Sequence, residues 1–142
     1  MGLLDNYTGI GMSPRPKWQH QLTITRAGRW MYDELEEQGL QIASEATVTD
    51  DWDDLAPDLV IFDQQFYPLT IIEITTHREL RRIIKKCYEL ITRFPQSEYF
   101  VYDYEDGVLY MFDSETGAWP SSKEYDLFSK YLERPLIKYL GK

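Results

Sequence analysis

Two short apolar runs near the middle of the chain constrain its fold more than any other feature of the sequence. Residues 57–62 read PDLVIF, residues 69–75 read LTIIEIT, and a turn over 64–68 separates them. Both runs are apolar and rich in β-branched residues, which is typical of short, largely buried strands at the centre of a sheet. The sequence therefore predicts two neighbouring central strands, the first opening with Asp58 and the second carrying Glu73 near its end.

The patterns on both sides of these runs predict the rest of the fold. Apolar residues recur at helical spacing over 17–38 and over 78–94, and Pro95 ends the second pattern. Alternation predicts a strand over 40–48, and Asp106-Gly107 predicts a hairpin between strands over 98–104 and 108–112. A final amphipathic helix is predicted from about Ser122 toward Leu132. This order of elements predicts an α/β fold in which helices flank a mixed sheet.

Length and composition set limits on the kind of protein. The 142 residues suit one domain over 1–142, with an irregular arm over 1–16 and a helical tail over 122–142. A single cysteine excludes an intrachain disulfide, so a cytoplasmic location is the expectation. No run of about 18 apolar residues exists, so no membrane span is expected. The formal charge of −9 argues against non-specific coating of nucleic acid, but local charge can still suit a nuclease.

Asp58 and Glu73 are the first candidates for chemistry. If the two central strands pair as a hairpin, the start of the first lies beside the end of the second, and the two carboxylates meet at one edge of the sheet. Such a pair suits Mg²⁺, which takes oxygen ligands and needs only one or two carboxylates from a protein. The alternative is that each is a solvated residue or a turn cap. Glu73 is the stronger case, because an acidic side chain inside an apolar strand is costly to bury unpaired.

The segments around this pair resemble the PD-(D/E)XK motif of restriction-endonuclease-like nucleases. Pro57-Asp58 followed by Glu73-Ile-Thr75 is similar to the motif itself. Met12-Ser-Pro-Arg-Pro with His20-Gln21 looks like the entry of the Uma-type endonuclease branch, and Glu98-Tyr-Phe-Val-Tyr-Asp103 resembles that branch's "EYW-V-D" strand. The resemblance covers roughly residues 9–113. It implies a restriction-endonuclease-like core of order αβββαβ, the same order that the periodicity predicts.

The resemblance also implies roles for individual residues. Asp58 and Glu73 would be catalytic and would hold Mg²⁺ (or Mn²⁺), with Glu45 as a third acidic ligand from the preceding strand. Thr75 stands where the motif has a lysine. Many members of this branch carry a lysine on the following helix instead, which here offers Lys85 and Lys86.

Helical geometry distinguishes the two lysines. At 100° per residue, Lys85 points almost directly away from the apolar stripe, whereas Lys86 lies on its flank. A lysine stem on the flank can run along the sheet and place its ammonium near a strand end. Lys86 is therefore the catalytic candidate, expected within about 6 Å of Glu73, which is the range of strong coupling between charges. The alternatives are a boundary lysine without a catalytic role, or one paired with Glu79.

The same helix is locally basic. Residues 78–93 contain six basic and two acidic residues, whereas the rest of the chain contains 9 basic and 22 acidic ones. A basic helix beside a metal site would suit contact with DNA phosphates, and Arg78, Arg81 and Arg82 are the candidates. A solvated helix face without a nucleic-acid role is the alternative.

Other residues carry weaker expectations. His77 follows the strand of Glu73 and could reach the cleft, and together with Thr75 and Lys85 it is a candidate accessory residue. His20 and Cys87 fall on apolar helix faces and are expected to pack in the core, and with two histidines a zinc site is not expected. The predicted hairpin contains alternating tyrosines, namely Tyr99, Tyr102, Tyr104 and Tyr110. Some of them must be exposed, and a homodimer could form through this hairpin or through another surface.

Two functions remain open from the sequence. The first is Mg²⁺-dependent hydrolysis of DNA phosphodiester bonds by a metal-activated water, without a covalent enzyme intermediate. The second is a non-catalytic module that keeps the nuclease fold and binds nucleic acid or a protein partner, because a fold does not by itself specify a function.

Overall fold

The elements follow one another in the predicted order. The computed structural model describes residues 18–45, 56–123 and 126–141, so the arm predicted over 1–16 lies outside the described residues. The elements are α1 (Trp18–Glu37), β1 (Gln41–Ser44), β2 (Leu59–Phe62), β3 (Pro68–Thr75), the short 3-10 helix η2 (His77–Glu79), α2 (Leu80–Arg93), β4 (Glu98–Asp103), β5 (Val108–Met111), β6 (Ser121–Ser122) and α3 (Leu136–Leu140).

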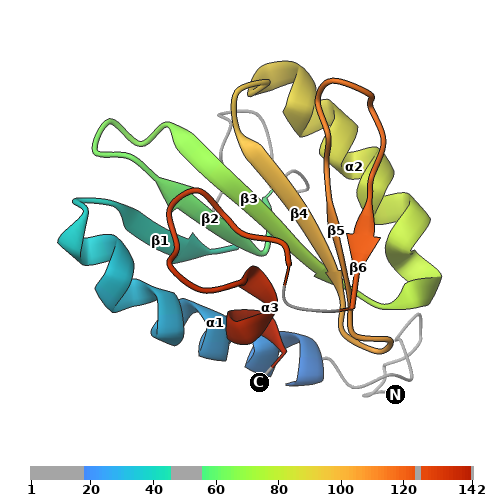
Figure 1. Cartoon of the computed structure of the whole chain (residues 1–142), viewed down its shortest axis with the longest axis horizontal. Helices are drawn as coiled ribbons and strands as arrows, with labels where there is room; N and C mark the ends of the chain where they lie inside the picture. Colours follow the sequence, from blue (N-terminus) through green and yellow to red (C-terminus); the bar gives the residue numbers. More distant parts are fainter. Residues whose placement is uncertain (1–17, 46–55, 124–125, 142) are drawn as a thin grey trace, which may run out of the picture.

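The strands form one mixed sheet in sequential order from β1 to β6 (Figure 1). All neighbours pair antiparallel except β3 and β4, which are parallel because α2 crosses over between them. The predicted α/β class and the αβββαβ core order are therefore confirmed. Within the described part of the chain, no helix is long and apolar enough to cross a membrane.

Helices cover both faces of the sheet (Figure 1). On one face, α1 and α3 pack against the strands through Ile24, Met31 and Leu136. On the other face, α2 packs through Cys87 and Leu90 against alternate residues of β2, β3 and β4. Since successive strand residues point to opposite faces, Glu73 lies on the same face as Ile71 and Val101, beneath α2.

The acidic residues gather at one end of the sheet because of strand direction. β2 runs opposite to β1 and β3, so its start lies beside the ends of both. Asp58 precedes β2, Glu45 follows β1, and Glu73 lies two residues before the end of β3. At the other end of the β2–β3 hairpin, the Asp63 side chain accepts hydrogen bonds from the backbone N–H groups of Gln65 and Tyr67, both at 2.9 Å. This hairpin therefore has an acidic end and a turn end.

The C-terminal segment differs from the prediction of a helix from Ser122 toward Leu132. Ser122 lies in β6, residues 126–135 are not helical, and the only helix of this described segment is the short α3. Glu98 holds the segment against the sheet: Oε1 accepts hydrogen bonds from Thr70 and Ser129, both at 2.7 Å, and Oε2 accepts one from the Lys130 N–H at 2.8 Å. The bond from Lys130 uses a backbone N–H that a helix would have used internally.

The tyrosines of the β4–β5 hairpin are less exposed than expected. Tyr99 and Tyr102 are buried, with 1% and 5% of their surface exposed, and Tyr104 and Tyr110 are partly buried. The reason is that helices cover both faces of β4. Exposed aromatic residues lie elsewhere, among them Trp18, Trp30 and Phe66.

Candidate metal centre at the acidic end of the sheet

Pairing of β2 with β3 brings Asp58 and Glu73 together. In this antiparallel ladder Leu59 lies opposite Ile72, so the next positions outward are Asp58 and Glu73. The Asp58 carboxylate Oδ2 accepts a hydrogen bond from the backbone N–H of Ile74 at 2.7 Å. The carboxylate is therefore held against β3, beside the strand residue that carries the second acid.

Glu73 is buried in a way that makes its negative charge costly. Only 1% of its surface is exposed. Burial raises the pKa of Glu73 to about 8, and the negative charge of Asp58 adds to this effect, while Lys86 opposes it. The net direction is upward because burial and Asp58 together outweigh the single lysine.

Lys86 reaches this pair from α2. Its Nζ lies 2.9 Å from Glu73 Oε2 and donates a hydrogen bond to the Ala56 carbonyl at 3.1 Å. The predicted approach of Lys86 to Glu73 is confirmed, and Lys85 is exposed as its helical angle predicts. Glu79 does not compete for Lys86, because it pairs with Arg82 at 2.6 Å.

His20 is the site residue that sequence reasoning missed. It was expected to pack in the core, but its Nε2 lies 3.2 Å from Asp58 Oδ2. The hydrogen bond with Asp58 raises the pKa of His20, burial opposes this, and the charges of Asp58, Glu45 and Glu73 add to the increase. His20 lies in the first turn of α1, where the helix passes the start of β2. The His20-Gln21 pair in the family resemblance was the signal that could have identified it.

Glu45 lies at the rim of the same cluster. Its backbone N–H donates to the Asp58 carbonyl at 2.9 Å, and its Oε2 accepts a hydrogen bond from Gln21 at 3.1 Å. The side chain is exposed, and the backbone has a positive φ of 53°. The fold thus brings the third acidic residue beside Asp58 through the backbone, while its carboxylate contacts α1.

The other residues predicted from the sequence are Thr75, His77 and three arginines, and each has its own contacts or exposure. Thr75 is buried and donates its hydroxyl to the Thr76 carbonyl at 3.1 Å. His77 lies against Asp103 and Asp106. Among the arginines, Arg78 and Arg81 are exposed, and Arg82 is exposed but paired with Glu79.

The residues present fit a divalent cation with oxygen ligands. Two carboxylates lie together with one of them deeply buried, and Lys86 Nζ contacts Glu73 Oε2 at 2.9 Å. Burial and the negative charge of Asp58 favour the protonated form of Glu73 by raising its pKa, and Lys86 opposes them. A cation bound to both carboxylates would offset this, and Asp58 and Glu73 are the residues that would hold it. The Glu45 carboxylate lies at the rim, where it contacts Gln21.

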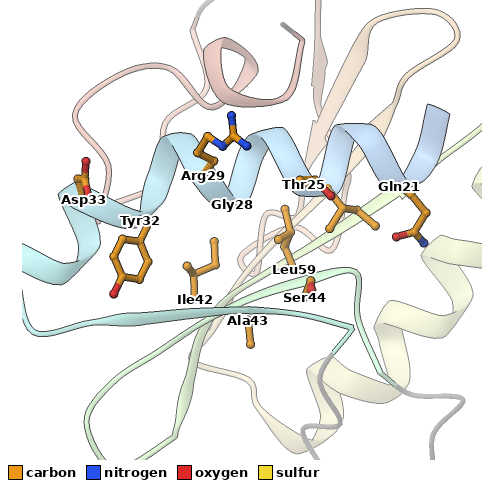
Figure 2. A pocket seen from close by; sticks show the side chains of 11 residues that line it. Gln21, Thr25, Gly28, Arg29, Tyr32, Asp33, Ile42, Ala43, Ser44 and Leu59 are labelled. Carbon is orange, nitrogen blue, oxygen red and sulfur yellow. The ribbon is translucent and has the colours of Figure 1, made fainter. Parts of the chain in front are cut away.

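An open groove begins beside this centre. It has a volume of about 540 Å³ and lies between α1 and the edge strand β1. Figure 2 shows Gln21 at one end of the groove and Tyr32 and Asp33 at the other. Gln21 also contacts Glu45, so the groove ends at the rim of the acidic cluster.

Comparison with known proteins supports the fold. No family model matches the chain, and no curated protein matches its sequence. Among solved structures, the chain is similar to the crystal structure of "a putative nuclease belonging to DUF820" from Anabaena variabilis ATCC 29413. The TM-score is 0.64 at 12% sequence identity, over 92% of this chain and 84% of that one. At this identity the likeness establishes a shared nuclease-like fold.

Proposed function

We propose that this protein is a metal-dependent nuclease that hydrolyses phosphodiester bonds of DNA. The observation that carries the proposal is the meeting of Asp58, Glu73 and Lys86 at one end of the sheet. The similar structure is described as "a putative nuclease". A cytoplasmic location agrees with a chain whose only cysteine is buried and free.

The proposed roles follow from the chemistry of each group. Asp58 and Glu73 hold Mg²⁺ or Mn²⁺, and Glu45 contributes from the rim. The cation would lower the pKa of water near the phosphate and stabilise negative charge on the phosphodiester. Lys86 places a positive charge at the same point, where it stabilises charge that develops as the bond breaks. His20 orients Asp58 through the contact at 3.2 Å.

The basic side of α2 provides a path for the DNA backbone. Arg78 and Arg81 are exposed near the start of the helix that carries Lys86, and Arg82 lies beside them. Contacts to phosphates position a duplex without reading its sequence. We therefore propose that these arginines hold the DNA while the acidic end of the sheet acts on one phosphodiester bond.

Plasmid cleavage tests this function directly. Supercoiled plasmid is incubated with the full-length protein and Mg²⁺ or Mn²⁺, and gel electrophoresis follows nicked and linear products. We expect cleavage that stops when a chelator removes the metal. Asp58→Asn and Glu73→Gln should each reduce the rate at least about a hundredfold, because loss of a direct metal ligand exceeds the usual effect of an outer-shell change.

The matched control is Glu115→Gln, which removes an exposed carboxylate from the β5–β6 loop. Circular dichroism and thermal unfolding establish that each variant is folded. Intact plasmid with both metals would contradict the proposal. If the folded protein then retained DNA or formed a homodimer, the evidence would favour the non-catalytic module.

A further inference from the structure

A second group of metal-binding side chains lies at the same end of the sheet, beyond the end of β4. Thr75 and Asp103 lie opposite each other at the ends of the parallel strands β3 and β4. His77 follows β3, and its Nδ1 lies 3.5 Å from Asp103 Oδ2 and 3.6 Å from Asp106 Oδ2. One ligand atom from each of the three residues lies within 4.8 Å of the others.

Asp103 gives independent evidence that this group is a binding site. Its surface is 0% exposed, and its Oδ1 accepts hydrogen bonds from the backbone N–H groups of Glu105 at 3.0 Å and Asp106 at 3.2 Å. Its Oδ2 is buried, faces His77 Nδ1, and has no hydrogen-bond donor among the described residues. A buried carboxylate oxygen without a donor is costly, so a bound cation would satisfy an atom that the protein leaves unsatisfied.

We propose that His77, Asp103 and Asp106 bind a divalent first-row transition metal ion such as Zn²⁺. An imidazole nitrogen with two carboxylate oxygens is a donor set that suits these ions. Two ligands each about 2.1 Å from a tetrahedral ion lie about 3.4 Å apart. The spacings of 3.5 Å and 3.6 Å from His77 are close to this value. Protein ligands would fill three positions, and water would complete the coordination.

Solvent can reach this site, and a bound ion would connect two segments of the chain there. The side chains of His77 and Asp106 are 69% and 52% exposed, so solvent reaches the site and both can adjust. Asp103 is fixed by the turn that it caps. The ion would connect the β4–β5 turn to η2, which leads directly into the helix of Lys86.

This proposal does not depend on nuclease activity. The Asp58–Glu73 pair offers carboxylate oxygens, which suit Mg²⁺, but the His20 imidazole lies 3.2 Å from Asp58 Oδ2, so both centres include a nitrogen that zinc can bind. Zinc binding by wild type therefore does not separate the two sites, and the comparison of Asp58→Asn with His77→Ala does.

Isothermal titration calorimetry of the full chain with zinc chloride tests the site. We expect wild type to bind Zn²⁺, and His77→Ala and Asp106→Asn each to weaken binding by about tenfold or more, since outer-shell changes alone reach this range. Asp58→Asn should retain zinc binding, and Glu115→Gln is the matched carboxylate control. His77 and Asp106 are exposed, so these variants leave the core unchanged.

Three results would overturn the proposal. The first is unchanged zinc affinity in His77→Ala and Asp106→Asn. The second is loss of zinc binding in Asp58→Asn, which would assign the zinc to the first centre. The third is absence of zinc binding by folded wild type in the millimolar range. None of these outcomes affects plasmid cleavage by wild type with Mg²⁺, which tests the proposed function separately.

Discussion

The Lys86 ammonium and the Glu73 carboxylate lie 2.9 Å apart, although one residue belongs to a helix and the other to a buried strand. The helix packs through Cys87, the residue after the lysine, against Val101 of β4, which is the residue paired with Glu73. Burial of Cys87 raises the pKa of its thiol, as expected for a cysteine that packs in the core. The packing of Cys87 therefore places the neighbouring lysine at the edge of the interface, directly above the acid.

This arrangement predicts different effects for two adjacent lysines. Lys86→Met keeps an aliphatic stem but removes the charge next to Glu73, and we expect plasmid cleavage to slow by about a hundredfold to a thousandfold. Lys85→Met removes an equal charge from an exposed position and should retain a rate close to that of wild type. Initial rates of nicking at saturating Mg²⁺ are the measurement. Equal losses in both variants would instead indicate a general effect of helix charge.

His20 should affect metal binding more than folding. In His20→Ala, Asp58 loses the partner at 3.2 Å that orients its carboxylate. Loss of such an orienting contact usually weakens metal affinity by about 10- to 100-fold. The Mn²⁺ concentration that gives half-maximal cleavage should increase accordingly. Gln19→Ala, an exposed change in the same helical turn, is the control, and an unchanged Mn²⁺ requirement in His20→Ala would contradict this role.

Glu98 should stabilise the fold without affecting chemistry. Glu98→Ala would leave the donors of Thr70, Ser129 and Lys130 without their buried acceptor. We expect the free energy of unfolding to fall by about 3 kcal/mol, the scale for unsatisfied buried polar groups. Urea unfolding of this variant and of Glu89→Ala, an exposed change on α2, measures the effect. Similar stability of the two variants would show that the C-terminal segment is held by other contacts.

The pH dependence of stability should include a contribution from Glu34. Burial raises the pKa of Glu34, but hydrogen bonds from Tyr139, the Glu133 N–H and Arg134 outweigh it and lower the pKa below 4.5. A pKa that is lower in the folded state stabilises the protein above the unfolded value and loses this effect as pH falls through the folded value. Unfolding free energies on both sides of pH 4.5 should therefore decrease toward acid less steeply in Glu34→Gln than in wild type. Glu37→Gln is the exposed control on the same helix.

Local patterns predicted the features that depend on neighbouring residues. The β-branched runs predicted β2 and β3, and hairpin pairing then brought Asp58 to Glu73. Helical angles separated the exposed Lys85 from the half-buried Lys86. These predictions succeeded because strand and helix periodicities fix the direction of side chains.

Long-range contacts account for the features of the structure that local patterns did not predict. His20 lies on the apolar side of α1, but the helix passes the end of the sheet at this turn, and no pattern within the helix indicates that crossing point. The helix predicted from Ser122 does not form over the described residues 126–135, where the Lys130 N–H donates to the Glu98 carboxylate instead of to a helical carbonyl. The helix α3 begins only after Pro135. The orphaned oxygen of Asp103 likewise depends on the turn that the first oxygen caps.

The turn end of the β2–β3 hairpin is a suitable position for a fluorescent label. Gln65 is exposed there, at the opposite end of both strands from Asp58 and Glu73, and Cys87 is buried. A Gln65→Cys chain would therefore present one readily reactive thiol for a fluorophore. The dye would follow diffusion and complex formation by anisotropy, while the acidic end stays free of any reporter.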